Sequence, residues 1–345
     1  MSVDPNERRH QQAPNDLRNT VVKSLLSVPA AFFGIVLGTA GFSSAWTQAS
    51  YVWPISPSVG ATLGVIAFAV WALLSLLYIL KWLLAREKAL AEFRHPIQCC
   101  FVALWPISGA LAAVPLKLLV PAAAPLVAFT GIGGALLFGV FRAGGLWQGG
   151  REPTATTPVL YLPTVAASLI STIVLSSFSH PSLARLFFGI GMFSWLALES
   201  VILNRLFVVS ELAPALRPTL GIQLAPPAVA CVAYESISTG LPDLFTQALI
   251  GYAIFQLLLL VRLTFWIRRQ PFNASYWAFA FGASALPTAI IRYIDRGGTG
   301  VIADLAPIVF VTTNLLAGSI AIATVWQLLK GRLLVATAIP SQPSR

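Results

Sequence analysis

The sequence predicts an all-α integral membrane protein with ten transmembrane helices. Apolar residues make up 57% of the 345 residues and charged residues only 10%, whereas soluble domains carry about 25% charged residues. Apolar runs recur along the whole chain at lengths near the roughly 20 residues that cross the hydrocarbon of a bilayer. Because the linkers between these runs are short, consecutive helices are expected to be antiparallel neighbours.

Ten apolar runs define the predicted spans. They are residues 27–47, 58–84, 97–119, 121–141, 157–178, 183–204, 218–238, 243–267, 275–294 and 302–329. Residues 1–26 are predicted to be a disordered cytoplasmic tail, residues 27–333 the transmembrane domain, and residues 334–345 a cytoplasmic C-terminal tail. A signal peptide is the alternative for the first run, but its hydrophobic region should be only about 7–15 residues long.

Basic residues predict the orientation of the spans. With the N-terminus in the cytoplasm, 18 of the 22 Lys and Arg residues fall in inner segments and four in outer ones: Lys117, Arg185, Arg292 and Arg296. Cytoplasmic loops are enriched in Lys and Arg, so both termini are predicted to be cytoplasmic. The same distribution explains the net charge of +10 as a topology signal and argues against nucleic acid as a partner.

Proline is concentrated inside the odd-numbered spans, at Pro106, Pro163, Pro226 with Pro227, and Pro287. Proline kinks a helix and frees a carbonyl, which in a membrane must face protein or water. The pattern therefore predicts five helical hairpins, with kinked odd helices as an inner pore ring and even helices outside. The alternative is that membrane helices tolerate proline and the alternation arose by chance.

Gly34, Gly38 and Gly41 form a stripe of small residues on the first span. Such a stripe is typical of close helix packing, and it is compatible with a smooth face toward a narrow pore. The residues expected to line the pore are Gly34, Gly38, Gly41, Pro106, Pro163, Pro226, Gly282 and Pro287.

Ionisable and nucleophilic residues inside the spans are few. Glu199 is expected to make a structural hydrogen bond or an ion pair with nearby Arg205, and Glu235 is expected to be solvated near the outer surface. Cys99 and Cys100 are neighbours and are expected to point to different helix faces. Nothing in the sequence has the spacing of a metal site or the residues of a catalytic set, so the prediction is no metal, no cofactor and no enzymatic activity.

Several segments, taken in order, resemble the tellurite-resistance/dicarboxylate transporter family, which is related to the plant guard-cell slow anion channel. The segments are FFGIVLG at 32–38, FVALWPIS at 101–108, GLWQGG at 145–150, YLPTVAA at 161–167, LFFGIGM at 186–192, GIQLAPP at 221–227, LVRLTFWI at 260–267 and WAFAFG at 277–282. They cover nearly the whole membrane region, and the ordered set is more specific than any one segment.

The resemblance implies ten helices as five hairpins, a homotrimer with one pore in each protomer, and a place in the bacterial inner membrane. It also implies that a phenylalanine on the ninth helix, Phe281 in this sequence, plugs the pore beside Gly282. This chain departs from the family pattern at Val36, where a proline is expected, and at Pro287, where one is not. The pore kinks are therefore expected at different heights.

The predicted function is an anion channel or uniporter for small anions, associated with tellurite resistance. A proton-coupled carrier of C4-dicarboxylates such as malate is the alternative, and a membrane-embedded enzyme is a third class. The absence of a proton relay of Asp, Glu and His across the spans counts against the carrier. The absence of a catalytic set counts against the enzyme.

Overall fold

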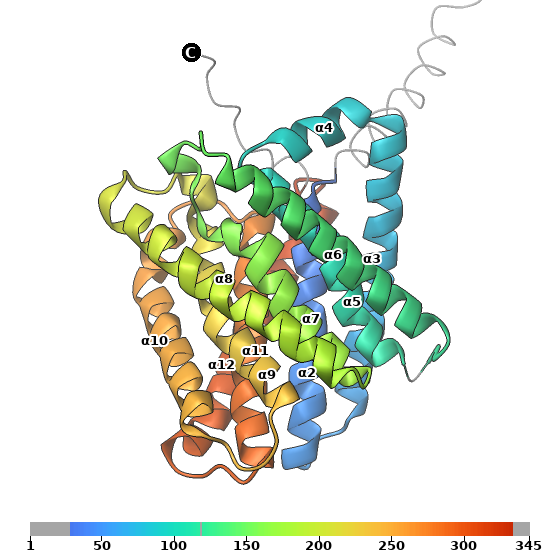
Figure 1. Cartoon of the computed structure of the whole chain (residues 1–345), viewed down its shortest axis with the longest axis vertical. Helices are drawn as coiled ribbons and strands as arrows, with labels where there is room; N and C mark the ends of the chain where they lie inside the picture. The colour runs from blue at the N-terminus through green and yellow to red at the C-terminus, as the bar shows by residue number, and fades with distance from the viewer. Residues whose placement is uncertain (1–27, 118, 334–345) are drawn as a thin grey trace, which may run out of the picture.

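The computed structural model describes residues 28–117 and 119–333, and every regular element in these ranges is helical (Figure 1). Ten helical segments there are long and apolar enough to cross a membrane. Their bounds are Ala30–Val52, Ser58–Leu84, Gln98–Leu116, Ala123–Trp147, Pro158–Ser177, Pro181–Val208, Pro214–Ile237, Leu244–Ile267, Ala274–Asp295 and Val301–Leu329. The predicted fold class and number of spans are thus confirmed, while the predicted tails lie outside the described residues.

The spans alternate between buried and exposed along the chain. In the first, third, fifth, seventh and ninth spans 61–83% of the residues of the most apolar stretch are buried, against 22–33% in the even spans. The main helices of the buried spans are α2 (Phe33–Val52), α5 (Leu104–Leu116), α7 (Ala167–Ser177), α9 (Ala225–Ile237) and α11 (Ala278–Asp295). The exposed spans are α3 (Ser58–Leu84), α6 (Ala123–Trp147), α8 (Pro181–Val208), α10 (Leu244–Ile267) and α12 (Val301–Leu329).

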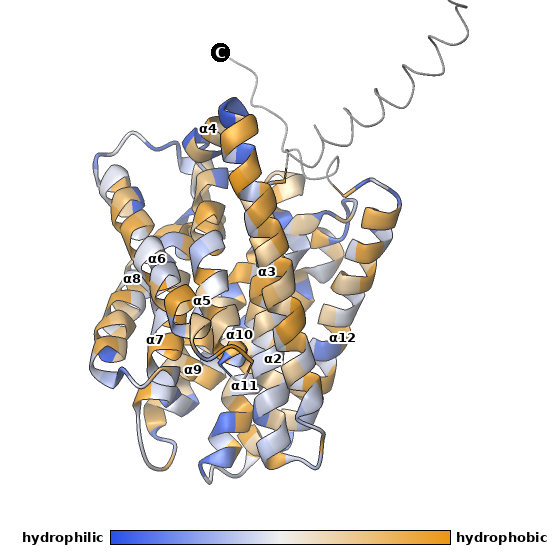
Figure 2. Ribbon diagram, turned by 90° about the vertical axis from the view of Figure 1, so that its right-hand side faces the viewer, coloured by the Kyte–Doolittle hydropathy of each residue, from blue (hydrophilic) through white to orange (hydrophobic). Residues whose placement is uncertain are grey.

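The exposed helices carry apolar side chains outward. In Figure 2, α3 is coloured as hydrophobic along most of its length. Leu76 and Leu137 are examples, with 55% and 72% of their surface exposed. Lipid is the solvent that accepts such a surface without cost, because acyl chains are as apolar as the side chains themselves.

Each buried span begins with a segment that is not α-helical. The segments are η1 (Ala30–Phe32), η2 (Gln98–Ala103), η4 (Pro158–Leu160) followed by η5 (Leu162–Ala166), η6 (Pro214–Leu224) and η7 (Ala274–Trp277). All are 3₁₀ helices except η5, which is a π-helix. Because they start the spans, they lie at the end of the bundle where α2 begins and α12 ends, which we name the terminal end. The opposite end, where α2 connects to α3 and α11 to α12, is the connection end.

A buried ion pair anchors the start of the first buried span. Lys81 Nζ lies 2.6 Å from Glu92 Oε2 and donates a hydrogen bond to the Val28 carbonyl at 3.1 Å. The other oxygen of Glu92 accepts the Ala30 N–H at 2.7 Å. Glu92 belongs to α4 (Arg86–Arg94), a short helix between the second and third spans. This charged helix of nine residues is too short to cross a membrane and lies where the sequence predicts a linker.

Candidate functional site

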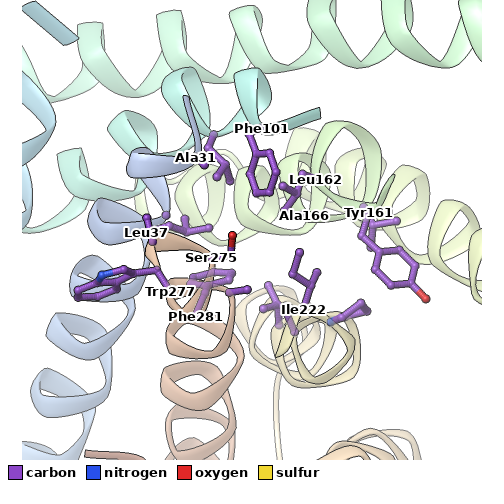
Figure 3. Close-up of a pocket in the computed structure, with 18 residues that line it drawn as sticks. Ala31, Leu37, Phe101, Tyr161, Leu162, Ala166, Ile222, Ser275, Trp277 and Phe281 are labelled. Atoms are coloured by element: carbon purple, nitrogen blue, oxygen red, sulfur yellow. The ribbon is translucent and has the colours of Figure 1, made fainter. Parts of the chain in front are cut away.

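A cavity of about 50 Å³ lies in the terminal half of the bundle (Figure 3). Its lining residues all come from the five buried spans, and every one of those spans contributes. The contributions include Leu37, Phe101, Leu162, Ile222 and Phe281. Figure 3 shows Phe101 and Leu162 along one side of this cavity and Phe281 along the other. We name it the terminal cavity, and its wall is almost entirely apolar.

A second cavity, of about 30 Å³, lies nearer the connection end. It too is lined only by the five buried spans, through residues that include Ser44, Leu111, Ile173 and Val232. Unlike the first, it contains a charged side chain, Arg292. We name it the connection cavity.

Hydroxyl groups on α11 add to the polarity of the connection cavity. Ser284 Oγ donates to the Phe281 carbonyl at 2.8 Å, and Thr288 Oγ1 donates to the Ser284 carbonyl at 2.7 Å. These bonds to the preceding turn use the hydroxyl protons, and both residues line the cavity. The hydroxyls therefore make its wall polar without making it positively charged.

Phe281 lines both cavities, as does Val229. Phe281 is buried, with 8% of its surface exposed. A methyl group added at Gly41 would lie 3.2 Å from Phe281 Cδ2 and 2.0 Å from Ser284 Oγ, so glycine leaves room for both side chains. The ring is thus held on α11 between the two cavities, against the smooth face of α2.

The other residues predicted to line a pore fall into two groups. Gly34 and Pro226 line the terminal cavity, and Gly41 lines the connection cavity. The remaining five belong to neither lining and pack against other helices or within their own: Gly38, Pro106, Pro163, Gly282 and Pro287.

The packing role of this second group has a clear geometric cause. The carbonyls of Pro106 and Pro163 would lie within 2.5 Å and 2.6 Å of a methyl group placed at Gly131 and Gly139 of α6. The two prolines therefore sit on the side of their spans that faces α6. Hydropathy and proline content alone do not reveal which side of a buried helix faces a cavity.

Comparison with known proteins identifies the family. A family model described as voltage-dependent anion channel, SLAC1, matches residues 27–325. The chain belongs to the SLAC1 family. It is 36% identical over 306 residues to the tellurite resistance protein TehA homolog of Haemophilus influenzae, an alignment that covers 88% of this chain and 92% of that protein.

Plant members of the SLAC1 family are more distant. Identity is 25% over 293 residues to the S-type anion channel SLAH2 and 24% over 287 residues to the guard cell S-type anion channel SLAC1, both of Arabidopsis thaliana. These alignments cover 83% and 79% of this chain but only 56% and 50% of the plant proteins. The family resemblance seen in the sequence is confirmed, and it places the chain among anion channels and transporters rather than enzymes.

Glu199 of this SLAC1-family chain ties an exposed helix to the wall of the terminal cavity. Its Oε2 accepts bonds from Tyr161 Oη at 2.5 Å and Trp195 Nε1 at 2.8 Å, and its Oε1 accepts one from Tyr252 Oη at 2.9 Å. Tyr161 lines the cavity with its ring, and its hydroxyl points away from the other labelled side chains in Figure 3. The predicted structural hydrogen bond is present, whereas an ion pair with Arg205 is not found among the described residues.

Cys99 and Cys100 differ from the sequence prediction. Their sulfur atoms lie 4.0 Å apart, and both side chains are buried, so they do not point to separate faces. The prediction assumed an α-helix, but the two residues belong to the 3₁₀ segment η2, where side chains are spaced differently. The described residues contain no group of three or more His, Cys, Asp or Glu side chains placed to hold a metal ion.

The surroundings of Glu235 and Arg292 differ from those expected from the sequence. Glu235 is only 2% exposed, which contradicts the expected solvated position, and Arg292 lines a cavity although it was counted as an outer topology residue. Both lie in the last turns of buried helices, Glu235 on α9 and Arg292 on α11. A charged residue within the last turn of a buried span, rather than beyond it, is the signal that could have identified them.

Proposed function

We propose that this SLAC1-family chain is an anion channel or uniporter whose pore is enclosed by the five buried spans and closed by Phe281. The observation that carries the proposal is the position of one ring in the walls of two cavities that are both lined by all five buried spans. In this proposal the five buried spans form the inner ring of five helical hairpins, and the exposed spans form the outer ring.

An apolar constriction suits a closed state. An anion that passes it must shed water without gaining a hydrogen bond, and burying an unpaired charge is costly. Conduction in the open state requires sites weak enough to release the ion. The terminal cavity meets that requirement because its wall offers no charged side chain.

Replacing Phe281 with Ala tests the gate. The substitution removes the ring that both cavities share, so we expect a rise in chloride conductance in planar bilayers of at least about tenfold, equivalent to about 1.4 kcal/mol of barrier. Phe279→Ala is the matched control, because Phe279 lies two residues away and packs against Gly221 and the groove between α10 and α12. It should leave conductance unchanged.

The same recordings separate the channel from the proton-coupled carrier. A steady current without a proton gradient supports the channel, whereas electrically silent exchange that needs a proton gradient supports the C4-dicarboxylate carrier. The gate assignment is wrong if Phe281→Ala folds normally and conducts no more than the parent while Phe279→Ala conducts more.

The cellular arrangement follows from the basic residues and the family. We propose a bacterial inner-membrane protein with the terminal end in the cytoplasm, assembled as a homotrimer. The distribution of Lys and Arg supports the orientation, and the family resemblance alone supports the trimer. A cysteine placed at exposed Glu87 should be shielded from an impermeant maleimide in intact spheroplasts, and one at exposed Thr299 should react. Native mass spectrometry checks the trimer.

A further inference from the structure

Arg292 is the charged side chain in the wall of the connection cavity. It lies in the last turn of α11, three turns beyond Phe281 on the same helix. Ser44, Ser284 and Thr288 line the cavity beside it. The feature to explain is why a guanidinium group lies next to the proposed gate, when the two cavities are lined by no other charged side chain.

One edge of the guanidinium group is fixed to α9. Arg292 Nη1 donates to Ser236 Oγ at 2.7 Å and to the Val232 carbonyl at 3.3 Å. Its Nε and Nη2 donate no hydrogen bond to any residue that the structure describes. The side chain is therefore held in place while part of its donor set stays available to a ligand in the cavity, and guanidinium donors bind anions through charge-assisted bonds.

The charged groups around Arg292 are a second arginine and two acidic residues. Arg292 and Arg296 both act electrostatically on Glu235, whose two carboxyl oxygens are buried and have no hydrogen-bond partner among the described residues. Arg296 donates through both terminal nitrogens, to the Ser238 hydroxyl at 3.0 Å and to the carbonyls of Ser238 and Glu235. Asp295 also acts electrostatically on Arg292, so two guanidinium groups stand beside two carboxyl groups, and the case for an anion rests on the unused donors of Arg292 rather than on net charge.

We propose that Arg292 forms an anion-binding site on the connection side of Phe281, for one small univalent anion such as chloride or nitrate. The cavity of about 30 Å³ holds one such ion or about two waters, given that a water needs roughly 10–15 Å³ on this measure. A C4-dicarboxylate does not fit it in this conformation. The hydroxyls already donate to backbone carbonyls, so one guanidinium edge supplies most of the attraction and the site stays weak enough to release its ion.

This inference adds an anion-binding site to the proposed channel, and its conduction test rests on that proposed function. In the Phe281→Ala background, Arg292→Gln should lower the permeability ratio of chloride to sodium, read from the reversal potential, by about tenfold, or 1.4 kcal/mol. Arg292→Lys keeps a positive charge and should preserve most of the ratio. A purely structural role of Arg292 in holding α9 would not be rescued by lysine in this way.

Lys117→Gln is the matched control for net charge. Lys117 lies at the same end of the bundle, but it donates to the Ser177 carbonyl and sits over the Phe178 ring, and it lines neither cavity. It should leave the permeability ratio unchanged. If Lys117→Gln changes the ratio as much as Arg292→Gln does, the effect comes from overall charge and the site is refuted.

A second measurement needs no conduction. Crystals of the full chain soaked in bromide should show an anomalous peak beside Arg292 that is absent in Arg292→Gln. A conducting Phe281→Ala variant with no bromide peak and unchanged selectivity in Arg292→Gln would refute the site and leave the gate intact. A non-conducting Phe281→Ala variant with the peak present would refute the gate and leave the site.

Discussion

The terminal and connection halves of the five buried spans differ in helix type and in wall chemistry. In the terminal half each span begins as a 3₁₀ or π segment and the enclosed cavity is apolar. In the connection half each span is an α-helix, and the enclosed cavity carries hydroxyls and an arginine. The same five spans thus present two different environments on the two sides of Phe281.

The difference has a cause in backbone geometry. A 3₁₀ helix rises about 2.0 Å per residue instead of about 1.5 Å, so the 11 residues of η6 extend about 22 Å rather than about 16 Å. The seventh span therefore covers this length with fewer side chains. At the start of the first span, the Lys81–Glu92 ion pair fixes where the helix begins.

The largest effect is expected from breaking the anchor at the terminal end. Lys81→Met leaves the buried Glu92 carboxylate without its partner, which typically costs about 3–5 kcal/mol. We expect a marked fall in the free energy of unfolding in detergent. Adding Glu92→Gln should recover more than half of the loss, because glutamine carries no charge and its Oε1 can still accept the Ala30 N–H. Failure of the second change to restore stability would show that the ion pair is not what anchors the span.

A smaller effect is expected from overpacking the connection half. The methyl group of Gly41→Ala would meet Ser284 Oγ and the Phe281 ring, and such overpacking typically costs about 1–3 kcal/mol. Gly34→Ala is the matched control in the terminal half, since its methyl group meets only Trp277 Cβ at 3.6 Å. Melting temperatures of the two variants should therefore separate. Equal values would mean that the close contacts at Gly41 relax without cost.

The smallest effect is a pH dependence at the terminal end. Burial lowers the pKa of His95 below its usual value, and its Nδ1 accepts the N–H groups of Ile97 and Gln98, each at 3.1 Å. Because the folded-state pKa is lowered, neutral His95 adds to the free energy of unfolding above about pH 6.5. This stabilisation is lost as the pH falls.

The test for His95 compares melting temperatures at about pH 7.5 and pH 5.5, on either side of the ordinary histidine pKa. The parent should melt lower at the acidic pH. His95→Asn, which can accept the same N–H groups but does not titrate, should show a smaller difference. An identical pH dependence in both proteins would assign it to other groups.

The sequence was sufficient to predict the membrane class and the ten spans, because hydropathy over about 20 residues is a strong signal. It was also sufficient for the buried and exposed alternation, through proline and glycine in the odd spans. It could not predict that Pro106 and Pro163 face α6, since the orientation of a helix about its own axis depends on packing with its neighbours.

The candidate site was only partly predictable for the same reason. Phe281 was selected by a family motif, and no property of the residue itself distinguishes it from Phe279. Arg292 was counted as a topology signal because it lies three residues before the end of its helix, and a count along the sequence does not separate the last turn from the loop. Only the packing of α9 against α11 shows that its side chain reaches the cavity.

The single ring between the two cavities has an electrical consequence. In the channel proposed above, once water joins each cavity to the solution on its own side, the membrane voltage would fall mainly across the stretch that Phe281 occupies instead of about 30 Å of hydrocarbon. A unit charge that passes Phe281 at about 100 mV then exchanges about 2.3 kcal/mol with the field over a few ångströms. In the proposed channel, the passage of the ion past Phe281 is therefore the step on which the membrane voltage acts most strongly.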